Sequence, residues 1–202
     1  KIFILENLHY AYLEARGDRK AKKKILLINT HVLSFTKNFL SIFENKKPSI
    51  IYTTRHPLSA LSSQILNNLT YQNGKNFFSK DLFFSFDLIF NSIYDYMKLG
   101  KVYVIQLEKL HKENRRVITD FCKIFKIKYE KCLRFSTFAG LTWWGDAISK
   151  KWISGINKKF QIKINEKIFF KKDLMFFQYL AEDIFQFYKY EFLTKPKKIY
   201  FN

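Results

Sequence analysis

The residues in this sequence that are best suited to chemistry stand where short apolar runs end. Arg55 follows the run 50–54, and Ser63 lies eight residues beyond it, after Pro57. A guanidinium offers a planar fork of donors that matches a phosphate or sulfate group, and a hydroxyl adds a further donor. Pro57 is placed where a helix would begin, and a helix N-terminus carries partial positive charge. The stretch therefore predicts half of a clamp for a phosphate group.

Two further apolar runs end in polar residues. The run 24–31 ends in His31, and the run 101–107 is followed directly by Glu108. If all three runs are parallel strands, an imidazole, a guanidinium and a carboxylate meet at one edge of the sheet. Ligands of open α/β sheets bind beyond the carboxyl ends of the strands. We therefore expect His31 and Arg55 at a binding site, and we expect a structural role for Glu108.

Apolar residues recur at helical spacing between and after these runs. Strands are predicted at 24–31, 49–54 and 101–107. Helices are predicted at 2–16, 36–45, 57–69, 80–98, 112–125 and 172–190. The segment 132–160 lacks a clean period and is expected to be a long loop. Strands that alternate with helices indicate an α/β fold, with a central, mostly parallel sheet flanked by helices.

The composition indicates a folded and strongly basic chain. Its 202 residues are enough for one domain with a sizeable core, and 48% are hydrophobic, which excludes a disordered chain. The formal net charge is +19, from 36 Lys and Arg residues against 17 Asp and Glu residues. Such a charge favours an anionic partner: a nucleotide, a sulfated or phosphorylated molecule, a nucleic acid or an acidic membrane surface. An equally good interpretation is that most lysines are simply solvated.

The cysteine and histidine patterns predict no metal site. Cys122 and Cys132 are the only cysteines and form no CxxC motif, and the four histidines do not complete a metal-ligand spacing. We expect two free thiols in a reducing compartment, and hence a cytoplasmic location. No apolar run approaches the ~20 residues of a membrane-spanning helix, and the sequence shows no signal-peptide pattern.

The order and spacing of these motifs resemble the family of sulfotransferases that use 3′-phosphoadenosine 5′-phosphosulfate (PAPS). Thr30 and His31 are similar to the TH motif that follows a short strand in the family. Arg55 and Ser63 are similar to its arginine and serine, which are also eight residues apart. The resemblance implies that Arg55 and Ser63 bind the 3′-phosphate of PAPS. It also implies that His31 is the general base that activates the acceptor hydroxyl.

Two later segments extend the resemblance. Residues 101–127 are similar to a strand, a YEDL motif and a helix of the family, although Leu107 stands where that motif has tyrosine. Residues 137–151 resemble the loop that folds over the nucleotide in bacterial members. The Arg-Lys-Gly sequence of that loop is absent here, and Lys150 and Lys151 are the nearest candidates for its cations. We therefore expect these two lysines to contact the nucleotide.

The resemblance also implies a fold and a reaction. The fold would be a P-loop-NTPase-like sandwich, and residues 1–202 would form a single sulfotransferase-like domain. The N-terminal strand and phosphosulfate-binding loop of the family are expected upstream of residue 1, because no such motif occurs within the chain. The reaction would move a sulfuryl group from PAPS to a hydroxyl or amine of a small-molecule or glycan acceptor, without a metal.

Two other classes of protein share some of these features. A nucleotide-dependent phosphotransferase of the P-loop type would have the same kind of sheet, but it needs a Walker lysine, and no Walker motif occurs here. A basic nucleic-acid-binding module would use the charge and the aromatic residues. The lysines are scattered, however, and no nucleic-acid-reading motif is present, so we expect no specific nucleic-acid partner.

Overall fold

The computed structural model describes most, but not all, of the chain. The described residues are 2–15, 17, 28–30, 33–43, 48–71, 79–99, 102–135, 137–138, 141–142, 156, 162, 164 and 169–193. The chain divides into two compact units, Lys1–Ile50 and Ile51–Asn202. We describe each unit by itself. The expectation of a single domain over 1–202 stays a prediction.

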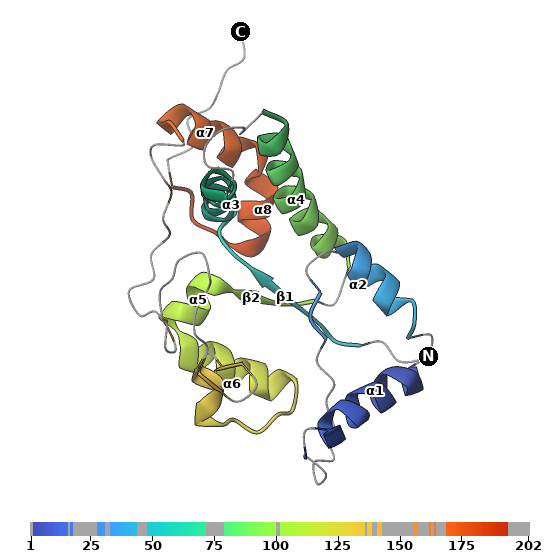
Figure 1. Cartoon of the computed structure of the whole chain (residues 1–202). Coiled ribbons are helices and arrows are strands. Elements are labelled where there is room, and N and C mark those ends of the chain that lie inside the picture. The colour runs from blue at the N-terminus through green and yellow to red at the C-terminus, as the bar shows by residue number, and fades with distance from the viewer. Residues whose placement is uncertain are drawn as a thin grey trace. The chain divides into compact units, whose positions relative to one another are not determined.

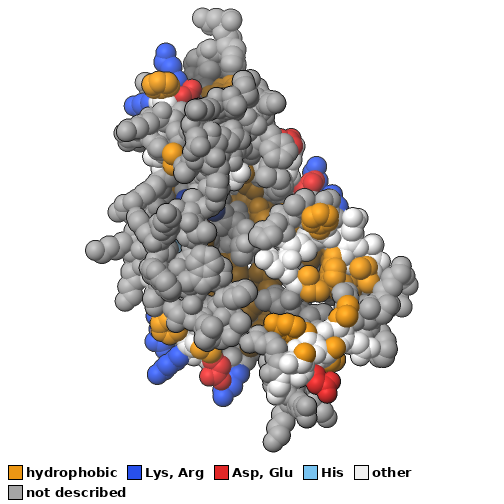
Figure 2. Space-filling model, viewed as in Figure 1, with side chains coloured by type: hydrophobic (Ala, Val, Ile, Leu, Met, Phe, Trp, Pro, Cys, Tyr) orange, Lys and Arg blue, Asp and Glu red, His pale blue; other side chains and the backbone are white. Residues whose placement is uncertain are grey.

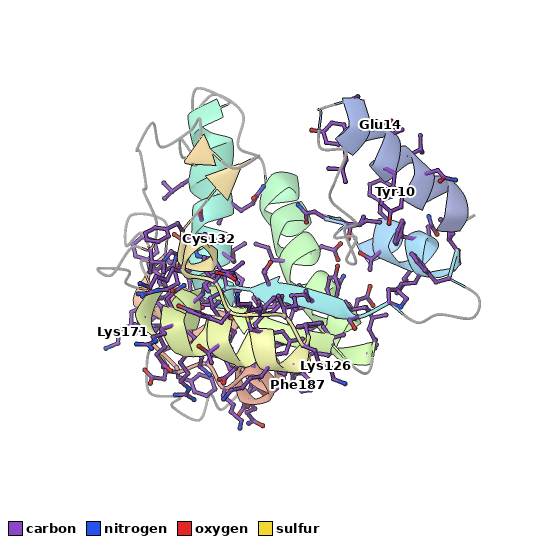
Figure 3. All side chains as sticks on the ribbon, turned by 90° about the horizontal axis from the view of Figure 1, so that it is seen from below. Tyr10, Glu14, Lys126, Cys132, Lys171 and Phe187 are labelled. Atoms are coloured by element: carbon purple, nitrogen blue, oxygen red, sulfur yellow. The ribbon has the colours of Figure 1, made fainter. Side chains whose placement is uncertain are left out.

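The first unit contains two helices, α1 (Ile2–Ala15) and α2 (Leu33–Leu40). Helix α1 matches the predicted helix 2–16 to within one residue. It is followed by Gly17, which has a positive φ of 78° and donates its N–H to the carbonyl of Glu14 at 2.9 Å, as is common after a helix C-terminus. Hydrophobic side chains of α1 and α2 face solvent in Figure 2, and Tyr10 and Glu14 project from α1 one turn apart (Figure 3).

The segment before α2 differs from the sequence prediction. Residues 28–30 belong to neither a strand nor a helix, and the rest of the predicted strand 24–31 lies outside the described residues. The hydroxyl of Thr30 is hydrogen-bonded to the hydroxyl of Thr36 at 2.6 Å. This contact joins the segment before α2 to the first turn of the helix. Helix α2 begins three residues earlier than predicted and ends five residues earlier.

Two adjacent parallel strands form the centre of the second unit, which begins within the first of them. They are β1 (Ile50–Thr54) and β2 (Val102–Gln106), and both were predicted. Helices α3 (Pro57–Tyr71) and α4 (Ser79–Lys98) connect them, as a parallel pair requires. The structure therefore confirms a mixed α/β arrangement with a parallel pair of strands. The larger sandwich stays a prediction.

Helices pack on both sides of this pair of strands. Helices α3, α4, α7 (Lys171–Leu180) and α8 (Glu182–Tyr188) lie on one side, and α5 (Leu107–Lys112) and α6 (Asn114–Ile124) on the other (Figure 1). The main core lies on the first side and consists of buried apolar residues: Leu58, Leu61, Ile65, Phe90, Ile93, Phe169, Ala181, Ile184, Phe185, Tyr188 and Tyr190.

Alternation along the strands explains why both faces are covered. Tyr103 of β2 contacts the rings of Phe121 and Phe125, whereas the next residue, Val104, packs against the main core. In β1, Tyr52 stacks on Tyr96 of α4, with ring centroids 4.1 Å apart. Successive side chains of a strand point to opposite faces, so β2 contributes to both layers.

Two predicted helices are interrupted. The predicted helix 112–125 corresponds to α6, and the short helix α5 precedes it, with Glu113 in a non-helical conformation between them. The predicted helix 172–190 is divided into α7 and α8 at Ala181, whose φ is −110°. An apolar period continues across such a break, so periodicity alone does not reveal it.

The predicted long loop 132–160 contains some regular structure. It includes most of a 3₁₀ turn, η1 (Lys131–Arg134), and a short antiparallel pair, β3 (Thr137–Phe138) and β4 (Leu141–Thr142). Cys132 of η1 is exposed (Figure 3), Cys122 of α6 is buried, and both thiols are free. Among the described helices, none combines the length and the apolar character needed to cross a membrane.

Candidate functional site

The candidate site is built around the junction between β1 and α3. The β-branched and aromatic residues of β1 end at Thr54, and Arg55 and His56 connect the strand to the helix. The carbonyl of His56 accepts the N–H of Ala60 at 2.9 Å, which is the first helical hydrogen bond, and Pro57 occupies the first helical position. The local sequence therefore places Arg55 at the carboxyl end of a strand and directly before a helix.

The second strand end meets this junction through Glu108. Helix α5 follows β2 without a loop, so Glu108 lies one residue beyond the first helical position. Its Oε1 accepts the backbone N–H of His56 at 2.8 Å, in a buried hydrogen bond. A carboxylate is stabilised at a helix N-terminus. Glu108 therefore binds the backbone N–H of the residue between Arg55 and α3.

Arg55 carries the donors that could bind an anion. Its Nε donates to the hydroxyl of Ser59 at 3.1 Å, and its terminal nitrogens have no hydrogen-bond partner among the described residues. Burial lowers the pKa of Arg55 below its usual value, and the charge of Glu108 acts in the opposite direction. A guanidinium remains protonated in proteins. The half-buried side chain therefore offers a fixed cation with unused donors.

His56 is neutral at pH 7. Its side chain is 0% exposed, and burial lowers its pKa to about 4. Its Nε2 lies 3.3 Å from the carbonyl oxygen of Glu191, so the single ring proton is assigned to Nε2 and Nδ1 is an acceptor. Nδ1 has no partner among the described residues. A group that stays neutral and buried is poorly suited to proton transfer with a solute near pH 7.

The end of α8 and the segment after it also contact the ends of β1 and β2. Lys189 has a positive φ of 55° and turns the chain back toward β1. The hydroxyl of Tyr190 then donates to that of Thr54 at 3.4 Å, and burial raises the pKa of Tyr190. The side-chain amide of Gln106, at the end of β2, donates to the carbonyl of Tyr188. The ends of both strands are therefore hydrogen-bonded to residues 188–191.

The structure describes two of the five residues that the sequence predicts at the site. Arg55 lies at the junction, as above. Ser63 is exposed on α3, one turn beyond Ser59. His31, Lys150 and Lys151 lie outside the described residues. The roles of all five stay predictions.

The sequence analysis missed three contributors to this junction. Ser59 accepts a hydrogen bond from Arg55, and its spacing of four residues from Arg55 is the signal that was available. Glu108 was noted as the residue after a strand, but its partner His56 is 52 positions away in the chain. The contact of Glu191 with His56 joins residues 135 positions apart, and no local pattern predicts it.

The described residues contain no group of three or more His, Cys, Asp or Glu side chains that could hold a metal ion. The chain matches no family model and no curated protein. A solved structure, a sulfotransferase domain from the curacin biosynthetic pathway, is similar at 17% sequence identity and a TM-score of 0.44. The match covers 71% of this chain and 54% of that domain's chain, about half its length. At this level the similarity assigns no role to any residue here.

Proposed function

We propose that this chain is a sulfotransferase domain that moves a sulfuryl group from PAPS to a hydroxyl or amine of an acceptor. The observation that carries the proposal is the position of Arg55 and the unused hydrogen-bond donors of its guanidinium. This residue carries a half-buried guanidinium with unused donors, at the carboxyl end of a parallel strand and the start of a 15-residue helix. The order and spacing of the surrounding motifs support the same function.

The 3′-phosphate of PAPS is the group that Arg55 would bind. A phosphate dianion matches the planar fork of a guanidinium, and a half-buried position strengthens the charge interaction. Ser59 holds Nε, which leaves the terminal nitrogens for the phosphate. Ser63, exposed one turn further along α3, would add its hydroxyl. The residues present therefore fit a nucleotide that carries a phosphate besides the one at its 5′ position.

The proposed reaction needs one base and several cations. The acceptor oxygen forms a bond to sulfur, while the bond from sulfur to the bridging phosphate oxygen breaks, and that oxygen keeps the electron pair. The proton of the acceptor passes to the imidazole of His31. Lys150 and Lys151 would hold charge on the nucleotide side. The products are the sulfated acceptor and adenosine 3′,5′-bisphosphate, and the acceptor is a small molecule or a glycan.

Ligand-induced thermal stabilisation tests the nucleotide part of this proposal. The chain is expected to bind adenosine 3′,5′-bisphosphate more tightly than AMP, because only the former carries the 3′-phosphate. Arg55→Ala should weaken bisphosphate binding by about 10-fold to 100-fold and leave AMP binding unchanged. Arg116→Ala is the matched control, since Arg116 is exposed and paired only with Glu113 among the described residues.

Two results would contradict the proposal. Equal affinity for AMP and the bisphosphate in the unmodified chain would exclude a 3′-phosphate clamp. An equal loss of affinity in the Arg55 and Arg116 variants would mean that overall charge, rather than a defined site, attracts the nucleotide.

A third variant tests the proposed base. His31→Ala should keep nucleotide binding and lower the rate of PAPS turnover by about 100-fold.

A further inference from the structure

Glu108 is the most unusual charged residue that the structure describes. Its side chain is 7% exposed, although carboxylates are rarely buried unless they are paired. One oxygen accepts the N–H of His56, and the other, Oε2, is out of contact with solvent and has no partner among the described residues. A buried acceptor without a partner costs about 1–3 kcal/mol, more when it is charged. The free-energy cost of burying this oxygen suggests that Glu108 has a role that compensates for it.

Direct contact with a ligand does not explain this residue. Neither the His56 N–H nor the Oε2 atom of Glu108 faces solvent, so neither of them contacts a solute in this conformation. A cap on α3 alone does not explain it either. Ser, Thr, Asp and Asn cap a helix from within the local sequence, whereas Glu108 reaches His56 from another strand end, 52 positions away.

We propose that Glu108 is a positioning residue for Arg55. It fixes the β1–α3 junction through its bond to the N–H of His56, the residue next to Arg55, and its negative charge attracts the neighbouring guanidinium, which donates to Ser59. This inference rests on the proposed function, because the purpose of a fixed guanidinium is to meet the 3′-phosphate. The charge of Glu108 also acts to raise the pKa values of Arg55, His111 and Tyr190.

The proposal predicts that removing the charge of Glu108 weakens bisphosphate binding, whereas simple charge repulsion predicts that the same change strengthens it. A carboxylate near an anion site repels the anion, so removal of the charge alone would strengthen bisphosphate binding. If Glu108 positions Arg55, the same removal frees a long side chain that must be ordered again when the phosphate binds, and this costs about 0.5–1.5 kcal/mol. Binding would then become weaker by about fivefold.

Glu108→Gln is the first variant to measure. Glutamine keeps an oxygen that can accept the His56 N–H, and it removes the charge. The expected result is about a fivefold weaker affinity for adenosine 3′,5′-bisphosphate, with AMP binding unchanged. Glu113→Gln is the matched control, because it removes a carboxylate from the residue between α5 and α6 that is exposed and paired with Arg116. The control should bind both nucleotides as the unmodified chain does.

A double-mutant cycle decides whether Glu108 acts through Arg55. In the Arg55→Ala background, Glu108→Gln should have no further effect on bisphosphate affinity, because the group that it positions is gone. An equal fall in both backgrounds, or tighter binding in Glu108→Gln alone, would overturn the proposal. If Glu108→Gln does not fold by circular dichroism, Glu108→Asp replaces it. It keeps the charge but moves it, so it should also weaken bisphosphate binding.

A measurement without ligand separates this inference from the proposed function. The Nε–H of Arg55, identified by its loss in Arg55→Lys, should exchange with solvent at least about fivefold faster in Glu108→Gln and at the same rate in Glu113→Gln. An unchanged rate in Glu108→Gln would reject the positioning role. If the unmodified chain does not prefer the bisphosphate, the proposed function fails, while the exchange rates still decide whether Glu108 positions Arg55.

Discussion

His56 shows that a histidine at a strand end can have a structural role. The backbone of His56 carries the contact that matters, from its N–H to Glu108, and its ring is enclosed by Phe185 and Tyr190. The ring donates through Nε2 to the carbonyl of Glu191. The imidazole therefore contributes packing and a hydrogen bond to the folded structure.

This environment predicts a specific dependence of stability on pH. The pKa of His56 is about 4 in the folded chain and about 6.5 in the unfolded chain. The unfolded state therefore takes up a proton first, and the stability of the folded state falls as the pH drops from about 6.5 toward 4. Between pH 7 and pH 5 this residue alone should reduce the free energy of unfolding by about 2 kcal/mol.

Urea denaturation at the two pH values measures this effect. His56→Asn keeps the backbone N–H for Glu108 and removes the titrating ring, so its stability should change less between pH 7 and pH 5 than that of the unmodified chain. His111→Asn is the comparison: burial also lowers the pKa of His111, but its imidazole is only partly buried, so its loss should change the pH dependence less than the loss of His56. The same pH dependence in His56→Asn and the unmodified chain would show that His56 is not a buried neutral histidine.

At the scale of elements, direct strand-to-helix transitions define the site. Helix α3 begins two residues after β1 ends, and α5 begins immediately after β2. Short transitions leave little freedom to Arg55 and Glu108, so their positions follow from the positions of the strands. Helix α3 itself is held by its buried face, where Leu58, Leu61 and Ile65 join the main core.

Core packing of α3 is therefore expected to contribute strongly to stability. Leu61 is 0% exposed, and Leu61→Ala should lower the free energy of unfolding by about 2–5 kcal/mol. Leu66→Ala on the same helix is the control, because Leu66 is exposed and should cost well under half as much. Equal losses from the two substitutions, measured by chemical denaturation, would contradict this orientation of α3.

Local signals account for what the sequence predicted correctly. β1 and α3 were predicted because a β-branched run is followed by a proline at the first helical position. Helix α5 was missed because no glycine, proline or capping residue separates it from β2; its N-cap residue, Gln106, makes no capping hydrogen bond with its side chain. The hydrogen bonds of His56 to Glu108 and to residues 188–191 could not be predicted, since they depend on how distant segments pack.

At the scale of the whole molecule, the net positive charge of the chain is a different property from the local chemistry of the candidate site. The net charge is +19, and on the face shown in Figure 2 the described Lys and Arg side chains lie beside Asp and Glu side chains. Arg116 pairs with Glu113, and Lys128 pairs with Glu130, both at the surface. Such pairs contribute little to stability, and they reduce the positive field locally.

The charge nevertheless predicts weak binding of polyanions that does not involve the site. Single-stranded DNA should bind at low salt and dissociate at about 0.3 M salt, because counterion release drives such binding. Arg55→Ala, which should weaken binding of adenosine 3′,5′-bisphosphate, should leave the DNA affinity almost unchanged. A large loss of DNA binding in this variant, measured by fluorescence anisotropy, would instead favour a nucleic-acid-binding module.

The return of the chain at residues 188–191 also affects the order of events during synthesis. His56, Gln106 and Thr54 depend on partners that leave the ribosome about 80 to 135 residues later. Until those partners appear, polar groups that are buried in the finished protein remain hydrated, and contacts between such distant residues form slowly. The nascent chain therefore completes the hydrogen bonds of the β1–α3 junction only after α8 has been translated.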